Sequence, residues 1–314
     1  MKSIIAYAPA STGNVSLGFD LLGAALKPID GSKLGDEVEV HAASEYSLEV
    51  KGAFAHKLPG DADQNIVTLC YHHFVEALVK QGKSVSPARL VLHKHLPIGS
   101  GLGSSASSIV AALHGLNVFY DTPFSEHDML LMMGELEGQI SGSIHYDNVA
   151  PCYVGGLTLM AEQPDQISLS LPVFDNWYWV ACYSGISVST AAARNILPKD
   201  VPMKTTIQFG RQLAVFIDAL YRKDEALAAS VMLDVLAEPY RKSLLPYFDE
   251  SRQFAMENGA LAFGISGSGP TVFAVTNSLE NAQTIKQWLA DNYIQNETGF
   301  SHVCQLDMQG AVAE

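Results

Sequence analysis

The stretch Pro97-Ile-Gly-Ser-Gly-Leu-Gly-Ser-Ser-Ala-Ser107 places three glycines at alternate positions directly before a run of small residues. It lies between a strand-like segment, 89–93, and a helix-like segment that begins near Ser104. Glycine permits positive φ and close approach of a ligand, and serine can cap a helix. Loop amides and the positive end of the helix dipole could then hold a polyphosphate with few cationic side chains. The stretch predicts a phosphate-binding loop, with a simple tight loop as the alternative.

Length and composition favour two domains of ordinary size. The chain has 314 residues, of which 48% are hydrophobic and 17% are charged, enough to bury one large core or two smaller ones. A formal net charge of −14 argues against nucleic acid and against an anionic membrane as partners. No apolar run approaches the length of a membrane span or of a secretory signal, so we expect a cytoplasmic protein.

The four cysteines predict neither a metal site nor a redox motif. Cys70, Cys152, Cys182 and Cys304 are scattered among apolar neighbours, with no Cys-x-x-Cys pair. Reduced thiols in the core are the ordinary outcome for such residues.

Hydrophobic periodicity predicts mixed strands and helices in the N-terminal half. The residues 36–41 and 46–51 fit two strands that pair antiparallel with each other, and Ser125 to Asp128 fits a capping box at the start of a helix. Further strands are expected at 3–8, 89–93 and 152–160, and helices at 65–81, 104–120 and 129–140.

The C-terminal half predicts a second layer of strands and helices packed on one sheet, hence an α+β class. Gly259 is placed to end the helix before it, as a glycine C-cap does. The expected strands are 167–171, 177–184, 260–265, 270–276 and 302–306, and the expected helices are 205–221, 224–237, 248–258 and 280–292.

Two groups of residues raise chemical questions that periodicity leaves open. Glu135 and Glu137 lie two residues apart on one predicted helix, so their side chains diverge and at most one can face a site. His145 and Asp147 are either an acid/base pair or parts of a polar turn, and the turn is favoured.

Three segments resemble the motifs of the GHMP kinase family. The residues 97–106 match its Pro-x-x-x-Gly-Leu-Gly-Ser-Ser-Ala motif at every fixed position, whereas a Walker loop would need a Lys-Ser/Thr pair after the last glycine. The residues 8–23 resemble the first motif in the form found in homoserine kinases, and 264–274 resemble the C-terminal motif. The segments 145–156, 187–194 and 237–241 are also similar to homoserine kinases, so the resemblance extends from Tyr7 to about Ala274.

The resemblance implies a two-domain α+β GHMP kinase fold. Residues 1–160 would form an ATP-binding domain like domain 2 of ribosomal protein S5, and residues 161–314 a ferredoxin-like domain, with the active site between them. The implied activity is ATP-dependent phosphorylation of the hydroxyl of L-homoserine, giving O-phosphohomoserine on the route to threonine. The implied cofactors are ATP and Mg²⁺, and the family expectation is a homodimer.

The resemblance also implies roles for individual residues. The nucleotide would contact Pro97, Ile98, Gly99, Ser100, Gly101, Leu102, Gly103, Ser104, Ser105, Ala106 and Ser107, together with Gly267, Ser268 and Gly269. Ser105 and Glu135 would hold the metal, with Glu137 as the alternative to Glu135. The catalytic set would be Asn14, Asn148 and Thr190. Substrate would bind Asp20 through its ammonium group and Arg194 and Arg241 through its carboxylate, while His145 helps to orient the hydroxyl.

Two other functions remain open from the sequence. Another GHMP kinase, of the mevalonate or shikimate type, would take a carboxylate without an ammonium group. Asp20 together with two arginines argues against such a substrate, provided that the three converge in the fold. A non-catalytic nucleotide-binding relative would keep the loop and lack turnover, so an assay with ATP and several hydroxy acids separates the three functions.

Overall fold

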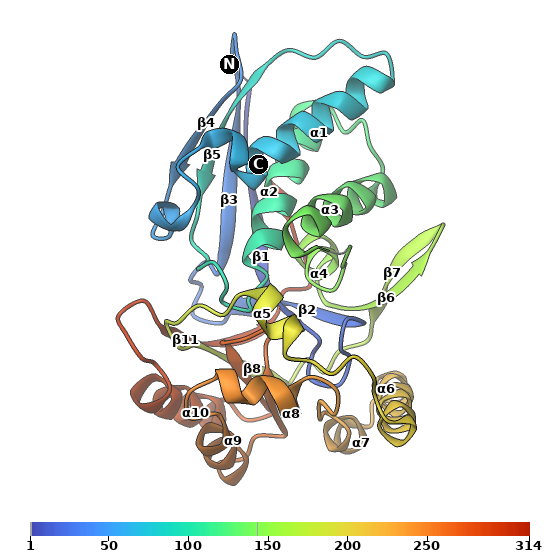
Figure 1. Cartoon of the computed structure of the whole chain (residues 1–314), viewed down its shortest axis with the longest axis vertical. Helices are drawn as coiled ribbons and strands as arrows, with labels where there is room; N and C mark the ends of the chain where they lie inside the picture. The colour runs from blue at the N-terminus through green and yellow to red at the C-terminus, as the bar shows by residue number, and fades with distance from the viewer. Residues whose placement is uncertain (1, 143) are drawn as a thin grey trace.

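The computed structural model describes residues 2–142 and 144–314, and a sheet of 12 strands runs through both halves of the chain (Figure 1). The strands are β1 (Ser3–Gly13), β2 (Leu22–Pro28), β3 (Gly35–Ala42), β4 (Ser47–Lys51), β5 (Ala88–His93), β6 (Leu157–Gln163), β7 (Gln166–Leu171), β8 (Tyr178–Tyr183), β9 (Ala262–Ile265), β10 (Val272–Thr276), β11 (Phe300–Leu306) and β12 (Val312–Ala313). Their order is β4-β5-β3-β1-β2-β11-β8-β10-β9, with β12 beside β1, and β6 between β2 and β7.

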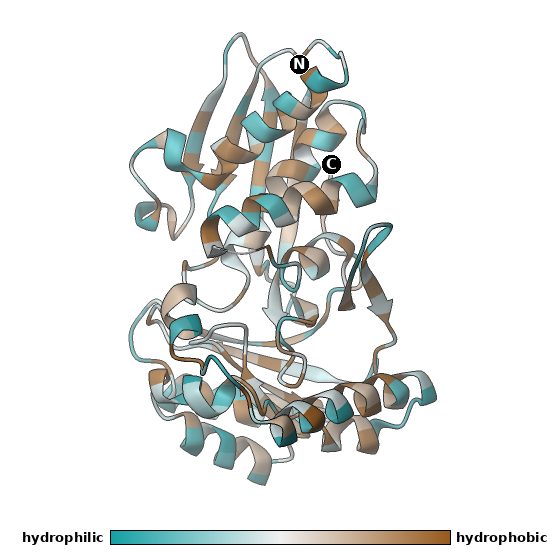
Figure 2. Ribbon diagram, turned by 45° about the vertical axis from the view of Figure 1, so that its right-hand side comes forward, coloured by the Kyte–Doolittle hydropathy of each residue, from teal (hydrophilic) through white to brown (hydrophobic). Residues whose placement is uncertain are grey.

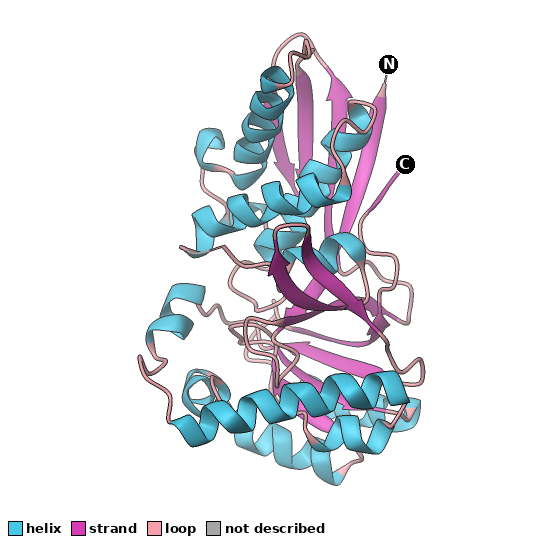
Figure 3. Cartoon of the chain, turned by 90° about the vertical axis from the view of Figure 1, so that its right-hand side faces the viewer, coloured by secondary structure: helices cyan, strands magenta, loops and turns pink. Residues whose placement is uncertain are grey.

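Helices cover one side of the N-terminal strands (Figure 3). They are α1 (Ile66–Lys80), α2 (Ser104–Phe119), α3 (Glu126–Ser141) and α4 (Val149–Val154), with short 3-10 turns η1 (Ala55–Lys57) and η2 (Ala62–Gln64). The Asn65 side chain caps α1, and Ser125 with Asp128 forms the expected capping box on α3. Helix α2 packs between the strands and α1 with almost every side chain buried, which the small residues of its first turns permit.

The helices of the C-terminal half pack on both faces of the C-terminal strands, and the first of them, residues 190–195, lies near the middle of the molecule (Figure 1). They are α5 (Thr190–Asn195), α6 (Met203–Arg222), α7 (Glu225–Ser230), α8 (Glu238–Arg241), α9 (Phe248–Glu257) and α10 (Leu279–Asn292), with the 3-10 turn η3 (Lys242–Leu244). Gly259, at φ 84°, follows α9 as expected for a glycine C-cap.

Three predicted elements are corrected by the structure. The strands β3 and β4 exist but do not pair with each other, because β5 lies between them, antiparallel to β3 and parallel to β4. The expected strand 152–160 begins as helix α4 and becomes strand β6 only after Gly155 and Gly156, both at positive φ. The expected helix 224–237 stops at Ser230, and Asp234 then accepts three backbone amides in the turn that leads into a separate short helix, α8.

The core consists of three clusters, and the central one joins the two halves of the chain. The first cluster lies between the N-terminal strands and α1, α2 and α3, and the third lies between the C-terminal strands and α9 and α10. The central cluster combines Leu22 and Leu26 from β2 with Trp179 and Phe273 from β8 and β10. Figure 2 shows hydrophobic residues along the strands and on the helix faces that meet them.

The four cysteines are buried and unpaired, as predicted. No helix within the described part of the chain is long and apolar enough to cross a membrane.

Candidate active site

Three glycine-containing loops meet at the junction of the two halves. The Gly267 amide donates to the Gly13 carbonyl at 3.1 Å, the Ser266 hydroxyl donates to the Gly101 carbonyl at 2.7 Å, and the Thr271 amide donates to the Ser100 carbonyl at 3.0 Å. A Cβ on Gly101, which has φ 79°, would lie 2.3 Å from the Ser266 carbonyl oxygen. The backbones therefore approach each other so closely that only glycine fits at this position.

The phosphate loop leads into the N-terminus of α2. Gly99, Gly101 and Gly103 all have positive φ, between 62° and 79°. Within the described residues no side chain caps α2 at Gly103, and the first amides of a helix have no acceptor within the helix itself. This combination of left-handed glycines and uncapped amides is chemically suited to the oxygens of a polyphosphate.

The structure places Glu135, the metal ligand preferred from sequence, outside the cleft, and the alternative, Glu137, inside it. The side chain of Glu135 is 54% exposed and pairs with His73 at 3.2 Å, whereas Glu137 lies in the cleft and accepts a hydrogen bond from the Ser105 hydroxyl at 2.9 Å. Burial raises the pKa of Glu137, and the Ser105 hydrogen bond and Lys94 oppose that shift. The two glutamates diverge on α3, and it is Glu137 that turns inward.

Glu137 and Ser105 fit a magnesium ion as hard oxygen donors. Within the described part of the chain no group of three or more His, Cys, Asp or Glu side chains forms a complete metal site. Mg²⁺ commonly takes only one or two protein oxygens and completes its shell with water and nucleotide phosphates. A hydroxyl and a carboxylate beside the phosphate loop satisfy that requirement.

Charged residues of both signs meet on the other side of the cleft. Arg194, on α5, forms a bidentate pair with Asp20, with nitrogen to oxygen distances of 3.0 and 3.2 Å. The Asp20 amide donates to the Asn14 side-chain oxygen at 2.9 Å, and the Asn14 amide group donates to the Gly267 carbonyl at 3.1 Å. Asp20 and Asn14 both have positive φ, 58° and 69°, an unusual conformation for residues with side chains that is common at functional sites.

Arg241 lies behind this pair and is 4% exposed. Its Nε donates to the Ala193 carbonyl and its Nη1 to the Gly267 carbonyl, both at 3.0 Å, and its guanidinium lies 5.2 Å from the centre of the Phe19 ring. Arg241 thus fixes α5 to the C-terminal glycine loop, while its remaining nitrogen hydrogens are left for another acceptor.

A second carboxylate, Asp147, lies beside Asp20. Burial raises the pKa of Asp147 to about 7, with further contributions from the negative charges of Asp20 and Glu137. Burial also lowers the pKa of His145, which lines the same cleft. Asn148 accepts a hydrogen bond from the Ser11 hydroxyl at 2.9 Å. The segment favoured from sequence as a polar turn therefore contributes His145, Asp147 and Asn148 to the lining of the cleft.

These residues line one cleft of about 580 Å³ between the two halves. Most of the residues predicted from sequence line it: Asn14, Asp20, Ile98, Gly99, Ser100, Gly101, Gly103, Ser104, Ser105, His145, Asn148, Thr190, Arg194, Arg241, Gly267 and Ser268. Pro97, Leu102, Ala106, Ser107, Gly269 and Glu135 are not among its lining residues. Leu102 and Ser107 are instead fully buried behind the loop.

The cleft has an apolar end that the sequence did not indicate. Leu58, Ile66, Leu69 and Ile140 line it together with the polar side chain of Gln64. Leu58 directly follows η1, and the others belong to η2, α1 and α3, so no contiguous motif could have shown that they converge. Glu137 did leave a signal, because it follows the buried Met133 by four residues on the same helix.

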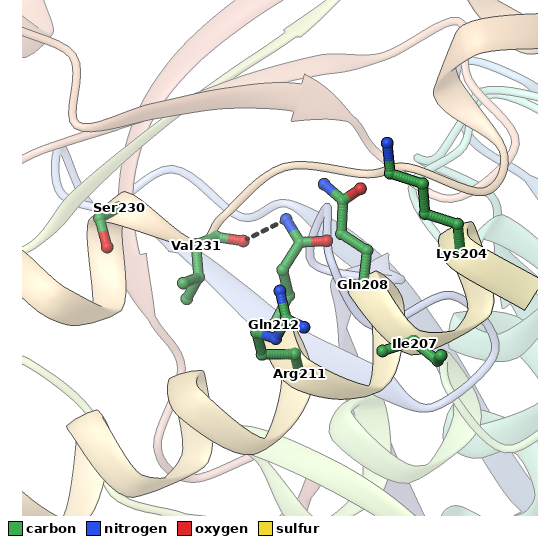
Figure 4. Close-up of a pocket in the computed structure, with 7 residues that line it drawn as sticks. All are labelled: Lys204, Ile207, Gln208, Arg211, Gln212, Ser230 and Val231. Atoms are coloured by element: carbon green, nitrogen blue, oxygen red, sulfur yellow. Dashed lines mark hydrogen bonds between the residues drawn. The ribbon is translucent and has the colours of Figure 1, made fainter.

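A second hollow, of about 630 Å³, lies between α6 and the end of α7 (Figure 4). Its lining is mostly exposed and includes Lys204 and Arg211. Its one buried side chain, Gln212, donates hydrogen bonds to the carbonyls of Val231 and Leu233 at 3.2 and 3.1 Å. Gln212 therefore connects α6 to the turn after α7. None of the residues predicted for the site lines this second hollow.

The chain is similar to known kinases in both sequence and fold. Two family descriptions match the chain: GHMP kinases N terminal domain over residues 65–156, and GHMP kinases C terminal over residues 216–295. A crystal structure of homoserine kinase from Cytophaga hutchinsonii is 32% identical, with a TM-score of 0.89 over 100% of this chain and 98% of that chain.

Mevalonate kinases share the fold at lower identity. A crystal structure of L. major mevalonate kinase in complex with R-mevalonate is 16% identical, with a TM-score of 0.67 over 97% of this chain and 96% of that one. Mevalonate kinase from Methanococcus jannaschii is 14% identical, with a TM-score of 0.69 over 96% and 98%. The expected α+β fold with N- and C-terminal GHMP kinase domains is confirmed, and the chain belongs to the GHMP kinase family.

Proposed function

We propose that this kinase transfers the γ-phosphoryl group of ATP to the side-chain hydroxyl of L-homoserine, on the route to threonine. The observation that carries the proposal is the meeting of two carboxylates, Asp20 and Asp147, with two guanidinium groups, Arg194 and Arg241, in the cleft that holds the phosphate loop. The likeness to the Cytophaga hutchinsonii homoserine kinase over the full chain supports it.

The charge pattern suits an acceptor that is an α-amino acid. On substrate binding Arg194 would exchange the Asp20 carboxylate for that of the substrate, and Arg241 would offer the nitrogen hydrogens that the backbone carbonyls leave available. Asp20 and Asp147 would face the ammonium group, whose positive charge would favour the ionised form of Asp147 that burial, and secondarily the nearby negative charges, disfavour. A substrate with only a carboxylate would bring no positive charge to these two acids.

The phosphate loop and the start of α2 would hold the nucleotide. Phosphoryl transfer depends on positioning and on charge stabilisation more than on covalent help, so backbone amides aimed at the phosphates suit it. Ser105 and Glu137 would hold Mg²⁺, which neutralises charge on the phosphate oxygens when bound. The apolar end of the cleft, around Ile66 and Leu69, suits a planar base.

The remaining polar residues would place the acceptor. Asn14, His145 and Asn148 would orient the hydroxyl, and Thr190, at the start of α5, would lie near the transferred phosphoryl group. The hydroxyl oxygen would form a new bond to the γ-phosphorus, the bond to the ADP oxygen would break, and the hydroxyl proton would leave to water or a cleft acceptor.

The deciding experiment measures ADP release from ATP with L-homoserine, mevalonate and shikimate in parallel. Turnover with L-homoserine alone supports the proposal, and turnover with mevalonate or shikimate would refute it in favour of another GHMP kinase. ATP binding without turnover of any acceptor would indicate a non-catalytic relative.

A matched pair of variants adds a control to this assay. Arg194→Gln should lower kcat/KM for L-homoserine strongly, because it removes the guanidinium proposed to bind the acceptor carboxylate and the bidentate partner that holds Asp20 in place. Arg211→Gln, an exposed arginine in the other hollow, should leave the kinetics unchanged.

A further inference from the structure

A buried ion pair lies behind the phosphate loop, outside every motif of the sequence. Lys94, just after β5, contacts Asp36, at the start of β3, and the two side chains are only 2% and 0% exposed. Burying two charges costs free energy that their attraction need not recover, so such a pair does not by itself explain stability. Its position relative to the loop suggests another reason for it.

Both carboxylate oxygens of Asp36 accept hydrogen bonds from residues at the two ends of the phosphate loop. Its Oδ1 accepts the amides of His95 and Leu96, at 2.8 and 3.0 Å, on the segment that enters the loop. Its Oδ2 accepts from Lys94 and, at 2.7 Å, from the hydroxyl of Ser108 in α2. One carboxylate therefore connects the entrance of the loop to the helix that leaves it.

The ammonium group of Lys94 likewise donates all of its hydrogens to neighbouring oxygens. It donates to Asp36, to the Ser104 carbonyl at 2.8 Å and to the Ser108 hydroxyl at 3.0 Å, which accounts for all three of its hydrogens. Lys94 reaches the wall of the cleft, yet it has no hydrogen left to donate to a phosphate. A neutral, fully bonded pair of this kind fixes geometry without adding a net charge to the site.

Serines complete the connection to the sheet. The Ser107 hydroxyl accepts from the Asp36 amide at 2.9 Å and donates to the Ala8 carbonyl at 2.8 Å, and the Ser104 hydroxyl donates to the Leu96 carbonyl at 3.2 Å. The first turn of α2 is thus attached to β1, β3 and the loop entrance at once. Ser104 and Ser107 act here as attachments of the helix.

We infer that Asp36 and Lys94 are positioning residues for the nucleotide: they hold the phosphate loop and the first amides of α2 in one arrangement, and ATP affinity depends on them. This inference rests on the proposed nucleotide site. A purely structural ion pair would contribute to folding and leave the affinity for ATP unchanged.

Asp36→Asn tests the inference, because an amide keeps the volume but has one acceptor oxygen where the network needs two. A matched control is Glu238→Gln, which removes the carboxylate charge from another ion pair, that of the buried Glu238 with the partly exposed Arg252, outside the residues that line the cleft. Ser108→Ala, which keeps both charges, is a milder variant in case Asp36→Asn does not fold.

The measurements are ATP titration of each folded variant, KM for ATP and for the acceptor, and thermal unfolding. Asp36→Asn should weaken ATP binding and raise KM for ATP by about tenfold or more, while KM for the acceptor stays within about twofold. Ser108→Ala should weaken ATP binding by at least about threefold, the scale of one neutral hydrogen bond. Glu238→Gln should lower the melting temperature without changing ATP affinity.

Unchanged ATP affinity in Asp36→Asn, or in Ser108→Ala if the first variant does not fold, would overturn the inference. An equal loss of ATP affinity in Glu238→Gln would do the same, because it would trace the effect to stability. A wild-type protein that binds no ATP would instead refute the proposed nucleotide site itself.

Discussion

Glu135 and Glu137 show how two residues of the same type on one helix acquire different chemistry from their direction alone. Glu135 points to solvent and pairs with His73, and Glu137 points to Ser105 in the cleft. The acidic residues are evident in the sequence, but the face of α3 that carries the site follows from where its buried methionines pack.

The first prediction concerns these glutamates. Glu137→Gln should lower kcat by about two orders of magnitude or more, because an amide oxygen is a far weaker ligand for Mg²⁺ than a carboxylate. Glu135→Gln is the matched control and should leave kcat nearly unchanged. Steady-state kinetics at saturating Mg²⁺ measures both, and the opposite ranking would restore Glu135 as the metal ligand.

The second prediction concerns Asp147 and pH. Its pKa is raised from 3.8 to about 7, so between these values the folded protein holds a proton that the unfolded chain has lost. The contribution of Asp147 to the free energy of unfolding is therefore greatest at acid pH. That contribution is lost as the pH rises through about 7. Asp147→Asn should remove that dependence and increase the free energy of unfolding near about pH 8 by at most about 4 kcal/mol.

Urea unfolding across this pH range checks the Asp147 prediction. Asp165→Asn, at an exposed turn, is the control and should follow the wild-type pH profile. If Asp147→Asn also follows the wild-type profile, burial of the Asp147 carboxylate does not govern the stability of the site.

The third prediction concerns Arg241 and the acceptor carboxylate. Arg241→Lys keeps the charge but loses the planar fork and its two bonds to the Ala193 and Gly267 carbonyls. We expect kcat/KM for L-homoserine to fall by the equivalent of about 1.5–3 kcal/mol, the scale of a hydrogen bond to a charged group. Activity with 3-aminopropan-1-ol, which lacks the carboxylate, should fall much less. An equal fall with both acceptors would mean that Arg241 only holds α5 in place.

At the scale of elements, the site depends on loops whose backbones touch. The fourth prediction is that Gly101→Ala abolishes ATP binding and lowers the melting temperature, because its Cβ would lie 2.3 Å from the Ser266 carbonyl oxygen and its φ is 79°. Gly210→Ala is the control: it lies in α6 with nothing within 4 Å of its Cβ position and should increase stability by about 0.5–1 kcal/mol. Titration with ATP and thermal unfolding measure both. Retained ATP affinity in Gly101→Ala would show that the loop tolerates separation from the C-terminal glycine motif.

Elements with strong local signals could be predicted from the sequence, and those set by tertiary context could not. Asn65 and Ser125 cap helices where expected because capping needs only neighbouring residues. The apolar run from Cys152 looked like a strand, yet residues 149–154 form α4, which packs against β1, β2 and α2. The parallel pairing of β4 with β5 depends on residues about 40 positions apart, which no local pattern reports.

The same limit separates the predicted and the missed parts of the site. The glycine loops, Asp20 and Arg194 lie in contiguous motifs that sequence alone can show. Asp36 and Lys94 are single residues 58 positions apart, and nothing near either one in the sequence indicates that they meet. Their roles become visible only when the strands bring them beneath the loop.

At the scale of the whole molecule, the domain boundary expected near residue 160 separates parts of the chain that share one continuous sheet and one core cluster. Strand β2 pairs with β1 on one side and with β11 on the other, and β12 returns from the C-terminal end to pair with β1. The central core cluster draws Leu22 and Leu26 from one side of the proposed boundary and Trp179 and Phe273 from the other. The two halves are therefore distinct in sequence but share a core and a sheet.

The fifth prediction follows from this shared core: the halves should unfold together. The three tryptophans, Trp177, Trp179 and Trp288, all lie in the C-terminal half, so fluorescence reports that half while far-ultraviolet circular dichroism reports the whole chain. In urea the two signals should give one midpoint, as two-state unfolding requires. Leu22→Ala, in the N-terminal half of the shared core, should lower both midpoints together, at a cost of about 2–5 kcal/mol.

Independent domains would behave differently in the same experiment. Leu22→Ala would then shift circular dichroism alone, and residues 1–160 expressed by themselves would fold. We expect that fragment not to fold stably as a monomer, because β2 would lose β11, β6 would lose β7 and β1 would lose β12. The apolar side chains of the central cluster would also be exposed to water, which costs about 25 cal/mol for each Å². A stably folded 1–160 fragment, together with separate midpoints, would show that the cleft lies between two independent domains and that the shared sheet is not required to form it.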